Sequence, residues 1–360
     1  MLKRMTRRGL LAGALGSALS AQTFSRKIRI GLSGFDGHPE EILRVLPEAP
    51  ELELAAVADD GSDPVARAQG LKNPFAARAR HYDALEDMLA HEQLDVVALC
   101  NNNGRRAAAI RACAARKLNV IAEKPLALKL ADLDAIYEAV KRSGIHLGML
   151  LPMRFDPPYL AMRRIVEAGE IGEVIAMDAQ KSYQLGARPD WQKHASTYGS
   201  TILWIAIHSI DLMLYVSGRR FTEVASTQSH VGFPKIGEMQ NVTASIFRLD
   251  NGGAAALHMD YLRPDTAGGH GDDRLRVAGA RGIVEYQEGT GVTLITDGAA
   301  MRTIRDLPPQ GSVFLDFLRA TYAGGTPALS WTQIVAANEA ALAAHLAAGA
   351  RGFVAIRRAG

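Results

Sequence analysis

Between residues 26 and 150 the chain alternates short apolar runs with amphipathic segments, and this order limits the folds that it can adopt. Residues 52–58 form a mostly apolar, strand-like run, and residues 94–100 form a nearly continuous apolar run, as expected for a strand that helices cover on both faces. Residues 105–116 and 130–143 have the apolar spacing of helices. Because strands that alternate with helices build a parallel sheet, we predict a doubly wound, Rossmann-like α/β domain over residues 25–150. Further strands are expected at 27–32, 119–122 and 146–151.

Residues 151–360 show a different pattern, in which helices mix with long strands. Asp250-Asn251-Gly252-Gly253 separates two strand-like runs, and such a turn is typical of a hairpin between antiparallel strands. We therefore predict a second domain of the α+β class. Its expected helices are 159–168, 202–216, 316–322 and 331–348, and its expected strands are 173–184, 223–232, 241–249, 253–261, 273–278, 282–286 and 292–296.

The composition supports a globular protein of two domains. The chain has 360 residues, of which 48% are apolar and 22% charged, and these values exclude disordered and fibrous chains. The net charge is +3, but the first 24 residues alone contribute +4, so no nucleic-acid-binding face is expected. Cys100 and Cys113 are the only cysteines. We predict two buried thiols, with a disulfide as the alternative.

Residues 1–24 have the features of an export signal. Arg7-Arg8 precede a short run of small and apolar residues that ends near Ala21. Paired arginines before Leu10-Leu11 resemble the twin-arginine motif, and the apolar run is too short to span a bilayer. We predict a periplasmic or otherwise exported protein that uses the twin-arginine machinery and has no stable membrane span. An uncleaved amphipathic helix is the alternative.

A glycine-rich loop follows the first expected strand. Glycines in such a loop let main-chain N–H groups approach a pyrophosphate. The spacing here is G-x-x-G-x-x-G, and Asp36 stands where a second glycine is expected. An ordinary strand–turn–helix connection is the alternative to dinucleotide binding. The predicted cofactor-binding residues of the loop are Gly31, Ser33, Gly34, Phe35 and Asp36.

Asp59 ends the second expected strand, about 20–30 residues after the glycines. An acid at this place accepts hydrogen bonds from the ribose diol of NAD, and its charge repels the 2′-phosphate of NADP. We predict NAD as the cofactor, with NADP less favoured. The alternative is a turn aspartate before Gly61.

The segment Glu123-Lys124-Pro125, with three asparagines and Arg106 upstream, resembles the Gfo/Idh/MocA oxidoreductase family. That family carries Glu-Lys-Pro after its fifth strand and Thr-Pro-Asn-x-x-His after its fourth, and Asn103 matches the asparagine. The resemblance implies a catalytic Lys124, whose pKa partial burial would lower into the range of acid–base catalysis. It also implies a large open, mostly antiparallel sheet and a homo-oligomer. The cofactor-binding residues that it implies are Asn101, Asn102, Asn103, Glu123, Lys124 and Arg154.

A second match to the family lies in the helix after Gly199. The family pattern is Asp-x-x-x-His-x-x-Asp, in which His208 and Asp211 match and Trp204 replaces the first acid. The resemblance implies that His208 takes part in catalysis, and we expect Asp211 to orient it. A histidine of the core is the alternative. Trp204 offers an apolar wall for a sugar ring or a nicotinamide.

Other candidates carry weaker signals. Lys181, Tyr183, Arg188, Trp191 and His194 follow a strand that leads toward the family's substrate pocket. No metal site is expected, because the segment 270–273 (HGDD) is better explained as a solvated turn.

The sequence therefore predicts an exported NAD(P)-dependent oxidoreductase that transfers hydride between a tightly held nicotinamide and a sugar, cyclitol or related polyol. Tight retention is expected because no nicotinamide pool exists outside the cytoplasm. One alternative is a redox-neutral enzyme that cleaves or epimerises glycosides with resident NAD. Another is a carbohydrate-binding relative without catalysis.

Overall fold

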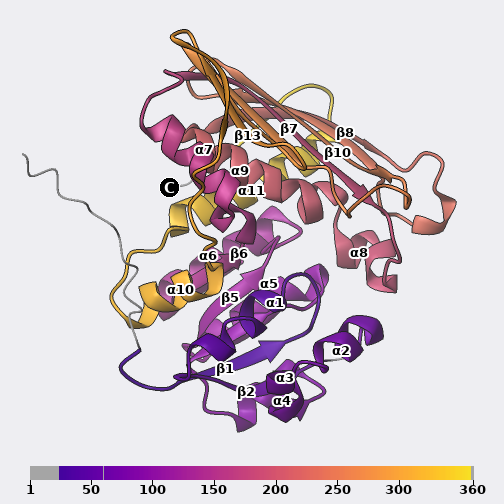
Figure 1. Ribbon diagram of the computed structural model, residues 1–360. Helices are drawn as coiled ribbons and strands as arrows, with labels where there is room; N and C mark the ends of the chain where they lie inside the picture. The colour runs from indigo at the N-terminus through magenta and orange to yellow at the C-terminus, as the bar shows by residue number, and fades with distance from the viewer. Residues whose placement is uncertain (1–23, 60, 358–360) are drawn as a thin grey trace, which may run out of the picture.

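The computed structural model describes residues 24–59 and 61–357, so residues 1–23 of the predicted export signal lie outside it. The first domain is a parallel sheet of six strands in the order β3-β2-β1-β4-β5-β6, flanked by helices (Figure 1). The predicted doubly wound fold is thereby confirmed. The strands are β1 (Ile28–Ser33), β2 (Leu52–Ala58), β3 (Arg80–Tyr82), β4 (Val96–Leu99), β5 (Asn119–Glu123) and β6 (Leu147–Leu150). The helices are α1 (Glu40–Leu43), α2 (Pro64–Gly70), α3 (Pro74–Arg78), α4 (Leu85–His91), α5 (Asn103–Ala115) and α6 (Leu130–Ser143).

The second domain contains a sheet of nine strands in the order β14-β13-β12-β11-β7-β10-β9-β8-β15. Only β7 and β10 pair in parallel, and every other neighbouring pair is antiparallel. The expected large, mostly antiparallel sheet is therefore confirmed. Its strands are β7 (Val174–Gln184), β8 (Phe221–Ser229), β9 (Val242–Leu249), β10 (Ala254–Arg263), β11 (Arg274–Gly279), β12 (Gly282–Gln287), β13 (Gly291–Thr296), β14 (Ala299–Ile304) and β15 (Val354–Ala355).

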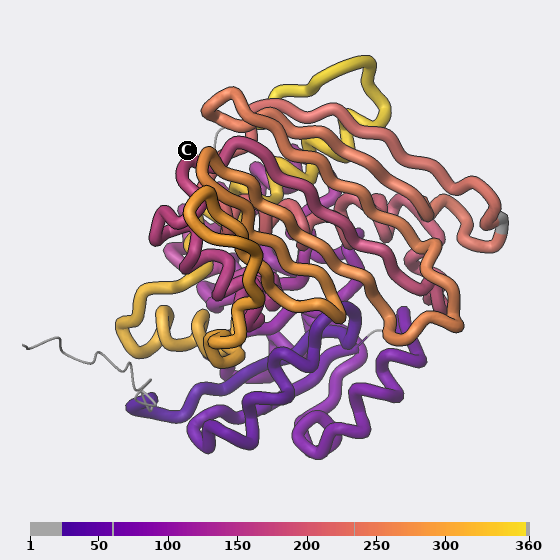
Figure 2. Tube along the Cα trace, turned by 45° about the horizontal axis from the view of Figure 1, so that its top comes forward, coloured from indigo at the N-terminus to yellow at the C-terminus, as the bar shows by residue number. Residues whose placement is uncertain are grey.

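Helices cover one face of this sheet and leave the other open. The helices α7 (Pro157–Glu167), α9 (Ile207–Ser217) and α11 (Trp331–Ala347) lie between the sheet and the first domain, and the strands spread across the opposite side (Figures 1 and 2). Buried and exposed residues alternate along β9, as expected for a strand with one covered face. The remaining α-helices are α8 (Ala195–Tyr198) and α10 (Val313–Tyr322), and a π-helical segment, Ile202–Ala206, directly precedes α9.

The sequence pattern does not indicate β3, α3 or β14. Two of the three residues of β3 are exposed, and five of the six residues of β14 are exposed. Both strands lie at a sheet edge. Edge strands of this kind lack the buried side chains whose periodicity marks a strand in a sequence.

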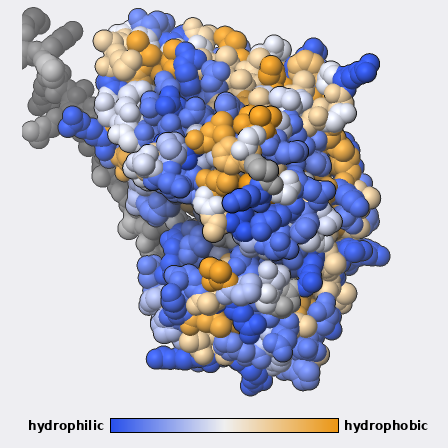
Figure 3. All heavy atoms as spheres, turned by 90° about the vertical axis from the view of Figure 1, so that its right-hand side faces the viewer, coloured by the Kyte–Doolittle hydropathy of each residue, from blue (hydrophilic) through white to orange (hydrophobic). Residues whose placement is uncertain are grey.

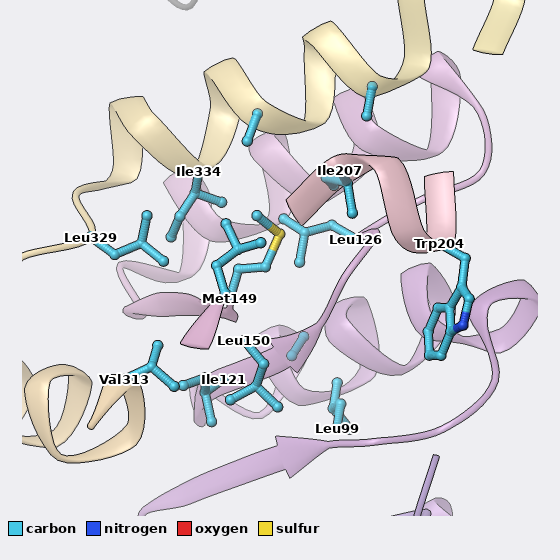
Figure 4. Close-up of a cluster of buried hydrophobic side chains, with 14 of the residues drawn as sticks. Leu99, Ile121, Leu126, Met149, Leu150, Trp204, Ile207, Val313, Leu329 and Ile334 are labelled. Carbon is cyan, nitrogen blue, oxygen red and sulfur yellow. The ribbon is translucent and has the colours of Figure 1, made fainter. Parts of the chain in front are cut away.

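The two domains share a continuous core. Leu126 and Met149 of the first domain lie beside Ile207 and Ile334 of the second, and all four are buried (Figure 4). Cys100 and Cys113 are buried free thiols, as predicted. The helical segment Ala195–Ser217 is long and apolar enough to cross a membrane, but 89% of its most apolar window is buried inside the protein, as in a core helix.

Candidate active site

Lys124 follows β5 at the carboxyl end of the parallel sheet, and only 1% of it is exposed. Its Nζ donates a hydrogen bond of 2.7 Å to the main-chain oxygen of Trp204 and lies 3.3 Å from the centroid of the Trp204 ring. Burial, opposed by the charge of Glu123 and assisted by that of Arg106, lowers the pKa of Lys124 to about 7. Lys124 can therefore gain or lose a proton at neutral pH.

His208, in the first turn of α9, is buried near Lys124. Burial and the positive charge of Lys124 lower its pKa, so its imidazole is neutral at physiological pH. Among the described residues its Nδ1 has no hydrogen-bond partner. This unpaired nitrogen is available to a hydroxyl group of a ligand.

His38 and Glu123 form a pair beside Lys124. The carboxylate of Glu123 accepts hydrogen bonds from the main-chain nitrogen and from Nδ1 of His38, at 2.6 and 2.7 Å. Burial raises the pKa of Glu123, but the charges of His38 and Lys124 outweigh that effect, and its pKa is lowered. The ring of His38 meets the ring of His208 edge to face, with centroids 5.2 Å apart. His38 is not among the site residues predicted from the sequence, although its place directly after the glycine loop is a signal for one.

One pocket brings these side chains together. It has a volume of about 440 Å³, and its walls include Lys124, His38, His208, Trp204, Tyr183 and Arg188. Both domains contribute to it. A larger pocket of about 710 Å³ lies between α6, β6, α10 and α11 and contains none of the predicted catalytic residues.

The expectation that Asp211 orients His208 is wrong. The carboxylate of Asp211 accepts two hydrogen bonds from the guanidinium of Arg154, and both side chains are buried. Arg154 also donates a hydrogen bond of 3.0 Å to Gln333. A buried guanidinium needs a carboxylate partner, and Asp211 supplies it. The donors of Arg154 are thus used within the second domain, and Arg154 does not line the pocket, which contradicts its predicted role at the cofactor.

The glycine loop packs tightly against the end of β4. A Cβ atom on Gly34 would lie 2.4 Å from the carbonyl oxygen of Cys100, and the φ angle of Gly34 is +79°, so only glycine fits there. Gly31 and Ser33 belong to β1, and the ring of Phe35 lies against Gly70.

Asp36 is buried in this loop and contacts the second domain. Its Oδ1 accepts a hydrogen bond of 3.0 Å from Trp191 Nε1. Burial and the nearby charge of Asp63 raise the pKa of Asp36 to about 7. Because a large fraction of Asp36 is then uncharged at neutral pH, its repulsion of a phosphate is weaker than the sequence indicates.

Asp59 lies directly after β2 and is buried. Its Oδ1 accepts a hydrogen bond of 2.7 Å from the main chain of Gly61. This is the contact expected of a turn aspartate, the alternative that the sequence left open. This bond occupies one of the two carboxylate oxygens. The other predicted role, at the ribose of NAD, stays a prediction.

The asparagines after β4 and the residue Arg106 support the segment around Lys124. Asn102 accepts a hydrogen bond from the main chain of Arg105 at the start of α5, and Asn103 donates to the carbonyl of Tyr198. Arg106 donates to the carbonyl oxygens of Lys124 and Pro125, at 3.0 and 2.9 Å. In contrast, the side-chain oxygen of Asn101 is buried without a partner among the described residues, which suits contact with a ligand.

The residues with weaker sequence signals lie in different places relative to the pocket. Lys181 is buried behind the pocket, where its Nζ donates to Asp273 at 2.6 Å and to the Tyr183 hydroxyl at 2.8 Å. Trp191 packs edge to face against Trp204, with ring centroids 5.5 Å apart. His194 lies outside the pocket and is exposed. Within the described part of the chain no group of three metal-ligating side chains is found.

Comparison with known proteins identifies the family. Residues 28–150 match the model of an oxidoreductase family with an NAD-binding Rossmann fold, and residues 159–285 match the GFO/IDH/MocA C-terminal domain. The chain belongs to the Gfo/Idh/MocA family. It is similar to myo-inositol 2-dehydrogenase of Thermotoga maritima, with 26% identity over 71% of this chain and 73% of that protein. For inositol 2-dehydrogenase of Salmonella typhimurium the identity is 26%, and the match spans 55% of each chain, little more than half of that relative.

Solved structures show the same relationship. The structure of a Thermotoga maritima protein described as an oxidoreductase is similar to this chain at 30% identity, with a TM-score of 0.85 and coverage of 91% of this chain and 100% of that one. The WlbA dehydrogenase of Bordetella pertussis, solved with NADH and UDP-GlcNAcA, shares the fold at 16% identity, with a TM-score of 0.77 and coverage of 93% and 99%.

This Gfo/Idh/MocA protein is thus an NAD-dependent oxidoreductase by family, and NAD is the cofactor of its Rossmann domain. The residues present fit that cofactor. Gly34 allows close approach at the end of the sheet, and Asn101 and His208 carry buried polar atoms that lack partners among the described residues. Asp36, whose pKa is about 7, can be uncharged, which would reduce its repulsion of the NAD pyrophosphate.

Proposed function

We propose that this protein is an exported oxidoreductase that interconverts a secondary alcohol and a ketone on a sugar, cyclitol or related polyol. The observation that carries this proposal is the shared pocket of Lys124 and His208, in which a lysine with a pKa near 7 lies beside a neutral imidazole. The name of the inositol dehydrogenase relatives supports a substrate with several hydroxyl groups.

Bound NAD would supply the hydride acceptor for oxidation of the substrate's carbinol carbon, and NADH the hydride donor for the reverse reduction. The protein must then move the hydroxyl proton. Neutral Lys124 accepts this proton during oxidation, and the ammonium form donates it during reduction. Because the pKa is about 7, both forms are populated at neutral pH, which suits a general acid–base group.

The neighbours of Lys124 hold it for this role. Arg106 fixes the carbonyl oxygens of Lys124 and Pro125, and the hydrogen bond to Trp204 orients Nζ. His208 donates to or accepts from the same substrate hydroxyl through a ring nitrogen, and the Glu123–His38 pair packs against its ring.

Two measurements test this function. Nucleotide released from the purified, denatured protein is identified by its absorbance and mass. The intact protein is then screened against inositols, aldoses and alditols for changes in nicotinamide absorbance. Retained NAD with reduction by a polyol supports the proposal. Product formation without net reduction indicates the redox-neutral alternative, and a protein without nucleotide or turnover indicates the non-catalytic one.

We propose that the protein is exported through the twin-arginine machinery. It would then hold NAD tightly, because no nicotinamide pool exists outside the cytoplasm. The support is the Arg7-Arg8 pair ahead of a short apolar run. Replacing both arginines with lysine is expected to leave the protein in the cytoplasm. Unchanged export of the double variant would contradict this localisation.

We propose a homo-oligomer formed through the open face of the nine-stranded sheet. Ile175 on β7 and Ile246 on β9 are 48% and 54% exposed, and apolar residues interrupt the polar surface mainly over the second domain (Figure 3). Exposed apolar residues on an open sheet face are typical of a surface that binds another protein, because their burial there is favourable. Light scattering of the wild type and of Ile246→Lys tests this: the variant should have the lower mass.

A further inference from the structure

Arg188, in the segment after β7, has an incomplete set of partners. It lines the pocket that contains Lys124. Its hydrogen bonds are long, at 3.5 Å to the side chain of Gln192 and 3.4 Å to the carbonyl of Gln184. Among the described residues its buried Nε has no hydrogen-bond partner, and Arg188 forms no ion pair with any of them. A guanidinium normally uses these donors on a carboxylate or phosphate.

The position of Arg188 is nevertheless defined. Its Cζ lies 4.4 Å from the centroid of the ring of Tyr261, which is itself buried. Stacking on an aromatic face restrains the guanidinium without using its N–H donors. The residue therefore presents fixed donors to the pocket.

Tyr183 adds a second donor to the same wall. Its hydroxyl oxygen accepts a hydrogen bond of 2.8 Å from Lys181 Nζ, so its proton is free to be donated elsewhere. Burial raises the pKa of Tyr183, which keeps the hydroxyl protonated. Lys181 is itself paired with Asp273 at 2.6 Å and does not reach the ligand directly.

The carboxylates that line the pocket are already engaged. Glu41 pairs with Arg44 at 2.7 Å, and Asp156 accepts a hydrogen bond of 2.8 Å from Gln310. Arg188 has no such partner among the described residues, and Lys124 adds a further positive charge when it is protonated. Arg188 thus lies in the pocket wall with donors that its described neighbours do not fully use.

We infer that the substrate carries a carboxylate and that Arg188, with the hydroxyl of Tyr183, binds it while the reacting alcohol lies at Lys124. This inference rests on the proposed function, because it assigns the substrate class of the same pocket: a sugar acid rather than a neutral polyol. The planar fork of the guanidinium matches a carboxylate. A phosphate ester presents the same oxyanion chemistry, but its second charge would lie among Glu41 and Asp156, and we assign the carboxylate.

The test compares hexuronates with the hexoses of the same configuration, in the gluco, galacto and manno series, and includes glucose 6-phosphate. Binding to the protein with its nicotinamide in place is measured by calorimetry, which requires no turnover. At least one hexuronate should bind ten times or more as tightly as its hexose and more tightly than the phosphate. A preference for the hexoses in all three series, or for the phosphate, would overturn the inference.

Arg188→Gln should weaken hexuronate binding by about 10- to 100-fold, as expected for a lost charge-assisted hydrogen bond, and change hexose binding by less than about twofold. Lys193→Gln removes an equal charge from the same segment and should leave both unchanged. Arg188→Lys, which retains the charge without the fork, should recover part of the loss. Equal losses for both ligands, or loss of the bound nucleotide, would overturn the inference.

The proposed function can fail separately. If hexuronates bind through Arg188 but no compound changes the nicotinamide absorbance, the oxidoreductase proposal fails while the anion site stands. If neutral polyols are oxidised equally well by the wild type and by Arg188→Gln, the function stands and this inference fails.

Discussion

The ammonium nitrogen of Lys124 lies 3.3 Å from the centroid of the Trp204 indole ring and donates a hydrogen bond of 2.7 Å to the carbonyl oxygen of the same residue. Trp204 stands where the family pattern has an acid. The lysine of the first domain is thus held by an apolar side chain and a main-chain oxygen of the second domain, without a carboxylate from that helix. Burial lowers the pKa of Lys124 to about 7, and Glu123 and Glu40 only partly oppose this effect.

The first prediction restores the acid. Trp204→Asp places a carboxylate near Lys124, which favours the ammonium and raises its pKa above 7. Oxidation needs the neutral amine, so the rising limb of the pH profile of kcat/KM for oxidation should move to higher pH by about 1 unit or more. Trp204→Asn has the same shape without the charge and serves as the control. A profile that moves equally in both variants would show that the charge is not the cause.

The second prediction concerns NAD binding and Asp36, whose pKa is about 7. Nearby phosphates favour the protonated acid, so binding of NAD takes up a proton. Affinity should therefore be constant below pH 7 and fall above it, by up to about tenfold per pH unit. Asp36→Asn should remove this dependence. Calorimetry with the apoprotein between pH 6 and 8.5 measures it.

The contact of Asp36 with Trp191 provides a second check. The Trp191 hydrogen bond stabilises the carboxylate and lowers the pKa of Asp36. Trp191→Phe should therefore move the loss of NAD affinity to higher pH. A shift to lower pH, or a pH dependence that survives in Asp36→Asn, would contradict the role of Asp36.

The third prediction concerns stability. Asp211→Asn leaves the buried guanidinium of Arg154 without its carboxylate, which is expected to lower the free energy of unfolding by about 3–5 kcal/mol. Urea unfolding measures this. Turnover by the folded variant should change far less than in His208→Asn, because Asp211 does not contact His208. A large loss of kcat at unchanged stability would restore Asp211 to the catalytic group.

Much of the fold could be predicted because its strands are buried. The run at β4 is continuously apolar and that at β2 is apolar except for Glu53, and the antiparallel pairing of β9 with β10 follows from the turn at 250–253. The strand β14 could not be predicted, because its residues are mostly exposed and show no apolar periodicity. In the site, Lys124 and His208 could be predicted because each stands in a segment that matches a family motif. The pairing of Asp211 with Arg154 depends on residues 57 positions apart, and helical spacing alone cannot distinguish such a partner from His208.

The most direct test of the account is the turnover of Lys124→Met on a confirmed substrate, with nucleotide content measured in the same preparation. A general acid–base group contributes about 10²- to 10⁴-fold, so kcat should fall within that range while NAD stays bound. His208→Asn should also impair turnover, but less. Full activity of Lys124→Met with bound NAD would contradict the central claim that Lys124 transfers the proton.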